Sequence, residues 1–357
     1  MRLHLDKIGS VTRNLRPGAS VTLTSDIRVE AGSVLAGRIL GEKSTYNQLE
    51  DLHGRFTRLH SGDVILGALG HRNALQGYEG VVPDNVAVGD RVHLLNLGGV
   101  LGHCTSHNPD VGSPFEVEVL GQLLVFPDFG SRAGQPASIQ MGALPAGDAL
   151  PTCPVVYVAG TCMNAGKTYA ACALVRRFAQ AGLKVGGAKL TGVSLMRDVL
   201  AMKDYGAAAV ADFTDAGVVT TDAKSATRAA RSVFAALMRQ GVDVIVAETG
   251  DGILGEYGVQ SIFADPELRA LGAAFLLCAN DPVGVVGGVE ELRTRYGISV
   301  DVVTGPATDN GVGVRFVAQA TGLPGLNARN QPMELAEHVL TLLKERVPNF
   351  SLTMVAK

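Results

Sequence analysis

The second half of the chain alternates short apolar runs with stretches whose apolar positions recur at helical spacing. The apolar runs cover residues 155–159, 185–190, 242–247, 273–278 and 299–303. After the first run, one face of a predicted helix carries Leu174, Val175, Phe178 and Ala181. Gly182 then ends this helix in the usual C-terminal capping position. Strands that alternate with helices predict right-handed βαβ units, and hence an α/β fold with a mostly parallel sheet flanked by helices.

The first 125 residues follow a different pattern, in which a turn of glycine and small or polar residues precedes an apolar strand. This pattern recurs at Ala31–Leu35, Ser61–Ile65 and Val88–Val92. Turn residues before apolar, β-branched runs signal the start of a strand, so their repetition predicts a small all-β barrel or sandwich. Residues 45–52 are the exception, and they fit a short helix or a loop.

The chain has 357 residues, more than one hydrophobic core commonly holds, so two domains are expected. Residues 126–154 are rich in Gly, Pro, Ala and Ser, a composition typical of a linker. We therefore predict an N-terminal β domain at residues 1–125, a linker at 126–154 and an α/β domain at 155–357.

Composition and charge argue against several classes of function. The formal net charge is −3, Trp is absent and aromatic residues make up 5%, so we expect no nucleic-acid partner. No apolar stretch is long enough to span a bilayer, and the N-terminus lacks the apolar core of a signal peptide. Five scattered cysteines without paired spacing are typical of a reducing compartment. These features predict a cytoplasmic protein without a membrane segment.

A glycine-rich segment directly follows the first apolar run: Gly160-Thr161-Cys162-Met163-Asn164-Ala165-Gly166-Lys167-Thr168. Phosphates need backbone N–H donors, close approach of the chain and a cation, and a glycine-rich turn before a helix provides the first two. Lys167 supplies the charge, and the Thr168 hydroxyl can bind Mg²⁺. The usual pattern has glycine where this chain has Thr161, and here the glycine stands one residue earlier. The segment predicts a P-loop whose phosphate-binding residues are Gly160, Thr161, Asn164, Ala165, Gly166, Lys167 and Thr168.

This Gly-Thr-x-x-x-x-Gly-Lys-Thr variant resembles dethiobiotin synthetase and the related cobyrinic acid synthetases of the P-loop class. The similarity continues through residues 167–174 and 181–189, covers 155–252 and extends more loosely to residue 325. The resemblance implies that Lys189 ends the second strand and contacts the phosphates and the reacting group. It also implies an acidic metal ligand at Asp198 and a Walker B glutamate at Glu248, so that Thr168, Asp198 and Glu248 surround Mg²⁺.

Two positions depart from the pattern of this family. Leu190 follows Lys189 where the family has proline, and Thr249 follows Glu248 where it has glycine. Residues that would hold a diaminated fatty acid cannot be matched, and dethiobiotin synthetase lacks the N-terminal β region. The resemblance thus implies the ATP and Mg²⁺ chemistry of the family, with Lys167 and Lys189 as catalytic residues. It leaves the acceptor substrate open.

Other polar groups at predicted strand ends are weaker candidates. Asp204 competes with Asp198 for the metal, and Asp251 either reaches a substrate or caps its loop. Residues 279–282 and 304–310 follow apolar strands, where they either read a nucleotide base or form turns.

The N-terminal half offers fewer groups with chemical potential. His103, Cys104 and His107 lie within one short stretch, but no fourth ligand stands at zinc-ribbon spacing. His71 and Arg72 either bind an anion or lie in a solvated loop. In the P-loop, Cys162 is either redox-sensitive or a small packing residue.

The leading hypothesis is an ATP- and Mg²⁺-dependent enzyme, a ligase or kinase-like phosphoryl transferase, that phosphorylates or activates a small-molecule carboxylate, carbamate or amine. A second hypothesis is an acyl-CoA-dependent N-acyltransferase whose P-loop holds the phosphates of coenzyme A. The pair Asp198 and Glu248 argues against it, because a coenzyme-only site has little use for a metal. A third hypothesis is a regulatory or metallochaperone NTPase. We expect a small-molecule substrate and a homodimer.

Overall fold

The computed structural model describes residues 1–127, 133–147, 150–348 and 350. The chain packs as two compact units with separate cores. Unit 1 comprises Met1–Leu144, Val193–Arg197 and Phe213–Thr220, and unit 2 comprises Pro145–Gly192, Asp198–Asp212 and Thr221–Lys357. Two short segments of the C-terminal half therefore belong to the N-terminal unit.

The predicted linker at 126–154 is partly ordered structure of unit 1. Within it, β13 (Gln135–Pro136) pairs with β12 (Glu116–Val125), and a 3-10 helix, η2, covers Ile139–Gly142. Residues 128–132 and 148–149 of this stretch lie outside the described residues. The prediction of one linker also did not foresee that residues 193–197 and 213–220 return to unit 1.

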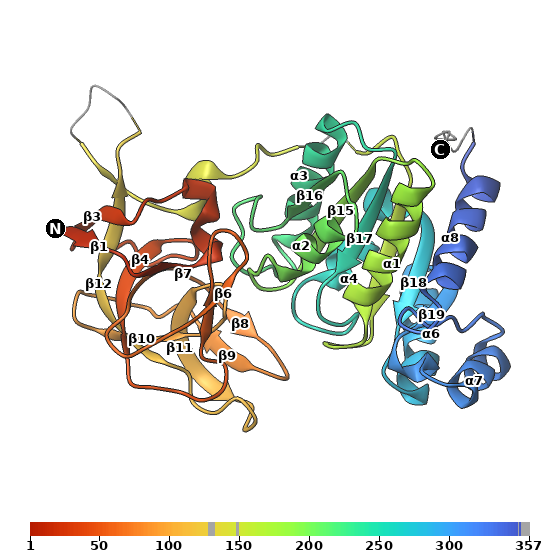
Figure 1. Ribbon diagram of the computed structural model, residues 1–357, viewed down its shortest axis with the longest axis horizontal. Coiled ribbons are helices and arrows are strands. Elements are labelled where there is room, and N and C mark those ends of the chain that lie inside the picture. Colours follow the sequence, from red (N-terminus) through yellow and green to blue (C-terminus); the bar gives the residue numbers. More distant parts are fainter. Residues whose placement is uncertain (128–132, 148–149, 349, 351–357) are drawn as a thin grey trace. The chain divides into compact units, whose positions relative to one another are not determined.

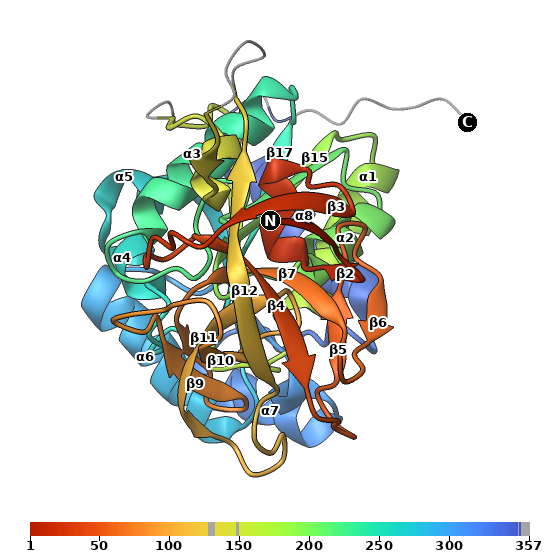
Figure 2. The ribbon, with the colours of Figure 1, turned by 90° about the vertical axis from the view of Figure 1, so that its left-hand side faces the viewer.

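Unit 1 is built on strands whose pairings close into a ring. These strands are β4 (Val34–Leu40), β7 (Val64–Leu69), β11 (Val100–His107), β10 (Arg91–Leu94) and β12. Each pairs with the next in this order, and β12 pairs again with β4. Only the pairing of β7 with β11 in this ring is parallel. The ring is a small barrel, one of the two all-β forms predicted; Figure 2 shows β12 and β4 side by side.

Further strands extend this barrel sheet. They are β1 (Arg2–His4), β2 (Lys7–Ile8), β3 (Ser20–Thr24), β8 (Arg72–Asn73) and β9 (Tyr78–Val81). Strands β3 and β1 continue the sheet beyond β12, whereas β9 and β8 continue it beyond β11. A 3-10 helix, η1 (Ser10–Leu15), follows β2.

The three recurring turns predicted from the sequence share one backbone conformation, a glycine with positive φ. Gly32, Gly62 and Gly89 have φ of 97°, 91° and 93°. Residues with a Cβ rarely adopt this left-handed region, so each turn requires its glycine. Strands β4, β7 and β10 begin within two residues of these glycines, as predicted.

The prediction of a short helix or loop at residues 45–52 was right only for the loop on either side of a strand that it missed. Gln48–Glu50 form strand β5, which pairs antiparallel with β6 (Phe56–Arg58). Leu49 and Glu50 are both fully buried. A strand this short depends on its pairing with β6 and on burial in the tertiary structure, because its own residues carry no clear alternation.

Unit 2 contains a six-stranded parallel sheet in the order β16-β15-β17-β14-β18-β19 (Figure 1). The strands are β14 (Val155–Gly160), β15 (Val185–Thr191), β16 (Ala209–Asp212), β17 (Val244–Thr249), β18 (Gly272–Cys278) and β19 (Val302–Thr304). The prediction of a parallel sheet is confirmed, although β16 was missed, and β17 and β19 begin two to three residues later than predicted.

Helices cover both faces of this sheet. They are α1 (Lys167–Gln180), α2 (Arg197–Asp204), α3 (Ala226–Arg239), α4 (Val259–Ala264), α5 (Pro266–Ala270), α6 (Pro282–Tyr296), α7 (Gly311–Thr321) and α8 (Pro332–Arg346). One core packs α3 to α7 against alternate strand residues such as Tyr157, and the other packs α1 and α8 against residues such as Val158. Among the described residues, no helix is both long and apolar enough to cross a membrane.

Candidate functional site

The carboxyl ends of the parallel strands of unit 2 bring the predicted site residues to one edge of the sheet. The P-loop follows β14, Lys189 lies near the end of β15, and Glu248 lies near the end of β17. Strand β17 pairs with both β14 and β15, and its Glu248 lies opposite Lys189 in register. Ligands of open α/β sheets bind at this edge, where the strand order reverses.

The P-loop links β14 to α1 through two residues with left-handed backbone. Asn164 has a φ of 58°, and Gly166 has a φ of 92° and caps α1. Lys167 is the first residue of α1, is 6% exposed, and donates from Nζ to the Cys162 carbonyl at 2.8 Å. A Cβ at Gly160 would lie 2.9 Å from Lys167 Cδ, so a larger residue there would force the lysine side chain to move. The loop thus places a buried lysine beside the N-terminus of a helix, as phosphate binding requires.

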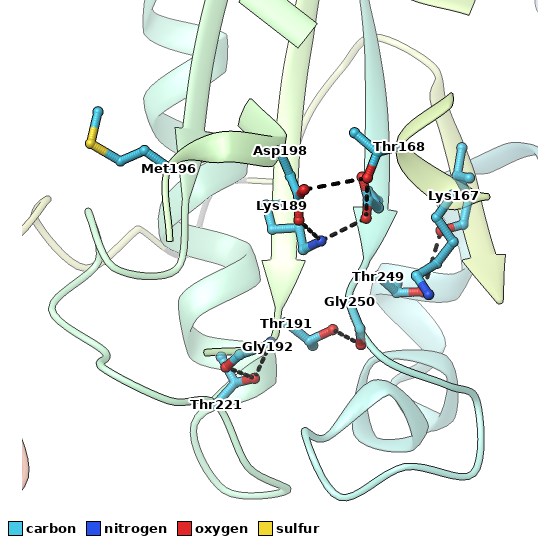
Figure 3. A network of polar contacts seen from close by, with 12 residues as sticks. Lys167, Thr168, Lys189, Thr191, Gly192, Met196, Asp198, Thr221, Thr249 and Gly250 are labelled. Carbon is cyan, nitrogen blue, oxygen red and sulfur yellow. Dashed lines mark hydrogen bonds and ion pairs between the residues drawn. The ribbon is translucent and has the colours of Figure 1, made fainter. Parts of the chain in front are cut away.

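Four polar side chains converge at this edge of the sheet, and Figure 3 labels three of them, Thr168, Lys189 and Asp198. Thr168 Oγ1 lies 3.4 Å from Asp198 Oδ1 and 3.3 Å from Glu248 Oε1. Lys189 Nζ lies 2.5 Å from Asp198 Oδ2 and 2.6 Å from Glu248 Oε1. The sequence-predicted residues Thr168, Lys189, Asp198 and Glu248 therefore form one contiguous polar cluster, although they come from four different elements.

The two lysines of this site differ in their electrostatic environment. Burial acts against the charge of Lys189, but the carboxylates of Asp198 and Glu248 outweigh this effect and raise its pKa. Burial lowers the pKa of Lys167, and the charge of Glu248 only partly opposes the shift. In the described part of the chain, no carboxylate lies within ion-pair distance of Lys167. Lys167 is thus a buried cation that an anionic ligand would stabilise.

The donor set of the cluster fits Mg²⁺. Thr168 offers a hydroxyl, and Asp198 and Glu248 offer carboxylates, which are the hard oxygen ligands that Mg²⁺ prefers together with phosphates and waters. Glu248 is 1% exposed, and its Oε2 atom has no hydrogen-bond partner among the described residues. Within those residues, no three His, Cys, Asp or Glu side chains form a metal cluster by themselves. A metal here therefore needs oxygen ligands from a bound phosphate as well.

The loop after β17 packs closely on the P-loop and on β15. A Cβ at Gly250 would lie 2.1 Å from the Thr191 carbonyl oxygen, and one at Gly252 would lie 2.4 Å from that of Thr161. Asp251 between them has a φ of 65°. Burial raises the pKa of Asp251, and the charge of Lys167 only partly opposes the rise. The structure thus places Asp251 within electrostatic reach of the P-loop lysine.

The remaining candidates of unit 2 separate into site and capping residues. Asp204 ends α2 and is exposed, whereas Asp198 in the first turn of the same helix contacts Thr168. Asp281 caps α6 by accepting from the Gly284 amide at 2.8 Å. Asn280 differs, because its Nδ2 donates to Cys162 Sγ in the P-loop at 2.9 Å. In the 304–310 segment, Asn310 caps α7.

The candidates of unit 1 do not form a comparable site. His103, Cys104 and His107 lie along β11, and no metal cluster includes them in the described ranges. Arg72 is buried, and its guanidinium lies over the rings of Tyr46 and Tyr78 at 5.2 and 5.6 Å from their centroids. Arg72 Nη1 also donates to the Tyr46 hydroxyl at 2.5 Å.

Sequence reasoning missed several polar residues that shape the edge of the sheet. Thr191 Oγ1 donates to the Gly250 carbonyl at 3.0 Å, and Thr221 Oγ1 donates to the Tyr257 carbonyl at 2.8 Å (Figure 3 shows Thr191 and Thr221). Asn327, which is 1% exposed, donates to Asp309 Oδ1 at 2.9 Å. Thr191 could have been found from its place at the end of an apolar strand. The sequence around Thr221 and Asn327 carries no comparable signal.

A scan against protein-family models finds no match for this chain, and a search of curated proteins finds none. Among solved structures, the signal recognition particle receptor FtsY from Elizabethkingia anophelis aligns over 56% of this chain and 68% of its own, at 17% identity and a TM-score of 0.38. The signal recognition particle 54 kDa protein from Aeropyrum pernix K1, in complex with GDP, aligns over 56% and 50%, at 16% identity and a TM-score of 0.35. FtsY from Thermotoga maritima aligns over 54% and 70%, at 19% identity and a TM-score of 0.34.

Proposed function

We propose that this chain binds a nucleoside triphosphate with Mg²⁺ at residues 160–168 and transfers or hydrolyses its terminal phosphoryl group. The observation that carries the proposal is the cluster of Thr168, Lys189, Asp198 and Glu248 beside Lys167. A loop that only joined a strand to a helix would not need two lysines and two carboxylates close to it. Phosphoryl transfer depends mainly on positioning and charge neutralisation, which are the functions that these groups can perform.

Each residue of the cluster has a role in the proposed chemistry. Lys167, at the start of α1, binds the phosphates together with the helix N-terminus. Thr168, Asp198 and Glu248 would hold Mg²⁺, and the bound metal would neutralise negative charge on the transferred phosphoryl group. Lys189 keeps a positive charge next to them, because two carboxylates stabilise its ammonium group. We propose that Lys189 also contacts the reacting group when the phosphates of a nucleotide are bound beside the cluster.

ATP and a small-molecule acceptor complete the proposal. The choice of ATP, and of a carboxylate, carbamate or amine as the acceptor, rests on the resemblance of residues 155–252 to dethiobiotin synthetase, a family that the comparisons with known proteins do not support. We further propose a homodimer in the cytoplasm as the working form. The acyl-CoA alternative stays weaker, because Asp198 and Glu248 both face Thr168 in the structure and such a pair is of little use to coenzyme A.

One observation favours a second function, a regulatory NTPase. Residues 193–197, which lead into Asp198, belong to unit 1, and so do residues 213–220. In switch proteins, segments next to the nucleotide site change their order or position when the terminal phosphate is bound. A regulatory NTPase would hydrolyse the nucleotide without a small-molecule acceptor, whereas a phosphoryl transferase would need one.

A thermal-shift panel of ATP, GTP and acyl-CoA, each with and without Mg²⁺, tests the proposal. A ligand that binds only the folded state raises the unfolding midpoint by mass action. We expect ATP with Mg²⁺ to give the largest shift, and the Lys167→Ala variant to lose it. Lys184→Ala is the matched control, because Lys184 is an exposed lysine that precedes β15. A shift that survives in Lys167→Ala, or that only acyl-CoA produces, would overturn the proposal.

A further inference from the structure

The segment that leads into Asp198 is part of unit 1. The chain leaves unit 2 after Gly192 and returns to it at Asp198, so residues 193–197 form a short excursion. Asp198 directly follows this excursion, in the first turn of α2, and contacts Thr168 and Lys189. Figure 3 shows Met196 on the segment that leads into α2 and Asp198. Because Met196 and Asp198 are only two residues apart, the position of one restricts the other to within about 7 Å.

Glu50 holds the end of the excursion. Its side chain lies at the end of β5 and is fully buried. Glu50 Oε2 accepts hydrogen bonds from the Met196 amide at 2.8 Å and from Ser10 Oγ at 2.5 Å. Burial raises the pKa of Glu50, whereas the amides of Met196 and Arg197, the Ser10 hydroxyl and the charge of Arg13 oppose the rise. A buried carboxylate is costly without such donors, so the excursion and Glu50 depend on each other.

The beginning of the excursion is held within unit 1 as well. The Ser194 amide donates to the Val219 carbonyl at 2.9 Å, and Val193 forms an antiparallel bridge with Thr220. A Cβ at Gly98 would lie 2.3 Å from the Ser194 carbonyl oxygen, so the backbone of unit 1 approaches the excursion as closely as glycine allows. Both ends of residues 193–197 are therefore fixed by unit 1, and Glu50 supplies the contact nearest to Asp198.

We propose that Glu50 is a positioning residue for Asp198: by accepting from the Met196 amide, it holds the segment from which α2 starts, and so it sets the Mg²⁺ affinity of the nucleotide site. This role rests on the proposed function, because it assigns Asp198 to the metal. Residues that orient a metal ligand commonly change metal affinity by about 10- to 100-fold when they are removed.

The first test measures the full-length protein without nucleotide or metal. Hydrogen exchange of amides 194–199 should be faster in Glu50→Gln. The neutral glutamine is a weaker acceptor for the Met196 amide than the charged carboxylate, so the segment should open more often. The matched control is Glu118→Gln, which removes a half-buried carboxylate of β12 paired with Arg38 in the same unit. Faster exchange throughout unit 1 in Glu50→Gln would assign Glu50 to the stability of that unit and overturn the positioning role.

The second test measures the Mg²⁺ dependence of nucleotide hydrolysis or transfer. The Mg²⁺ concentration at half-maximal rate should rise by about tenfold or more in Glu50→Gln, while the thermal shift with ATP and EDTA stays at the wild-type value. Gly98→Ala, whose new Cβ would lie 2.3 Å from the Ser194 carbonyl oxygen and so displace the segment, should give the same pair of results. A wild-type Mg²⁺ dependence in both variants would overturn the positioning role alone. A wild-type protein that shows neither nucleotide shift nor Mg²⁺ dependence would overturn the proposed function, and this role with it.

Discussion

Lys189 Nζ lies 2.6 Å from Glu248 Oε1, and the two residues stand directly opposite each other on the neighbouring parallel strands β15 and β17. The register of the sheet brings these side chains together, so the contact does not depend on a flexible loop. The same ammonium group lies 2.5 Å from Asp198 Oδ2. In this arrangement Lys189 balances the charge of two carboxylates that would otherwise repel each other at the edge of the sheet.

Removing the charge of Lys189 should therefore destabilise the metal-free protein. We expect Lys189→Met to lower the free energy of unfolding by about 3 kcal/mol, because Glu248 is left as a buried, unpaired carboxylate. Mg²⁺ should recover more stability in this variant than in the wild type, since it would then be the only cation between the carboxylates. Urea unfolding with and without Mg²⁺ measures both effects. Lys203→Met on the exposed side of α2 is the control, and an equal Mg²⁺ effect in all three proteins would contradict the prediction.

Asp198 and Glu248 should act on the metal more than on the fold. Asp198→Asn and Glu248→Gln keep the size of each side chain, so we expect the far-UV circular dichroism of both variants to match the wild type. The Mg²⁺ concentration for half-maximal turnover should rise by at least about tenfold in each. Asp204→Asn, which changes the exposed aspartate at the other end of α2, should leave it unchanged. Loss of the folded spectrum in both site variants would make the two residues structural.

The buried charge of Lys167 should cost stability when no phosphate is bound. Burial lowers the pKa of this lysine, which means that the folded protein disfavours its charged form. Lys167→Met keeps much of the side chain without the charge, and we expect it to raise the free energy of unfolding of the ligand-free protein by about 1 kcal/mol. The same variant should lose the nucleotide-dependent shift. A ligand-free variant less stable than the wild type would show that the Lys167 ammonium is stabilised by the loop itself.

Asp251 should give a defined dependence of stability on pH. Burial raises its pKa in the folded protein above the ordinary value of 3.8. A carboxyl group with a raised pKa stabilises the folded state below the unfolded value, and this contribution is lost as the pH rises through the folded value. The stability of Asp251→Asn relative to the wild type should therefore increase from about pH 4 to neutral pH. Urea unfolding across this range measures the difference, and a constant difference would contradict the assignment.

The phosphate site was predictable from the sequence because its residues stand at strand ends. Lys167 and Thr168 follow β14, and Lys189 and Glu248 come near the ends of β15 and β17, so a parallel sheet brings them to one edge. No local pattern could show that Glu50 binds the Met196 amide, since 146 residues separate the two. The misread strand β5, which carries Glu50, has the same cause, because its pairing and burial come from tertiary structure.

The two segments of the C-terminal half that belong to unit 1 predict how residues 145–357 should behave when they are expressed alone. In the full chain, Asn14 Nδ2 donates to the Thr214 carbonyl at 2.7 Å, and Arg13 pairs with Asp215 at 2.9 Å. The truncated chain lacks these partners and also lacks Glu50, so residues 193–197 and 213–220 lose their support.

The P-loop itself lies within unit 2 and keeps its surroundings in the truncated chain. We therefore expect residues 145–357 to retain a thermal shift with ATP in EDTA, but to lose most of the further shift that Mg²⁺ produces in the full chain. Full-length Glu248→Gln is the matched control, because it removes a metal ligand while unit 1 remains in place. Glu248→Gln and the truncated chain should show the same loss, since each leaves the metal with an incomplete set of oxygen ligands. A truncated protein whose Mg²⁺-dependent shift equals that of the full chain would show that Asp198 finds its place without unit 1.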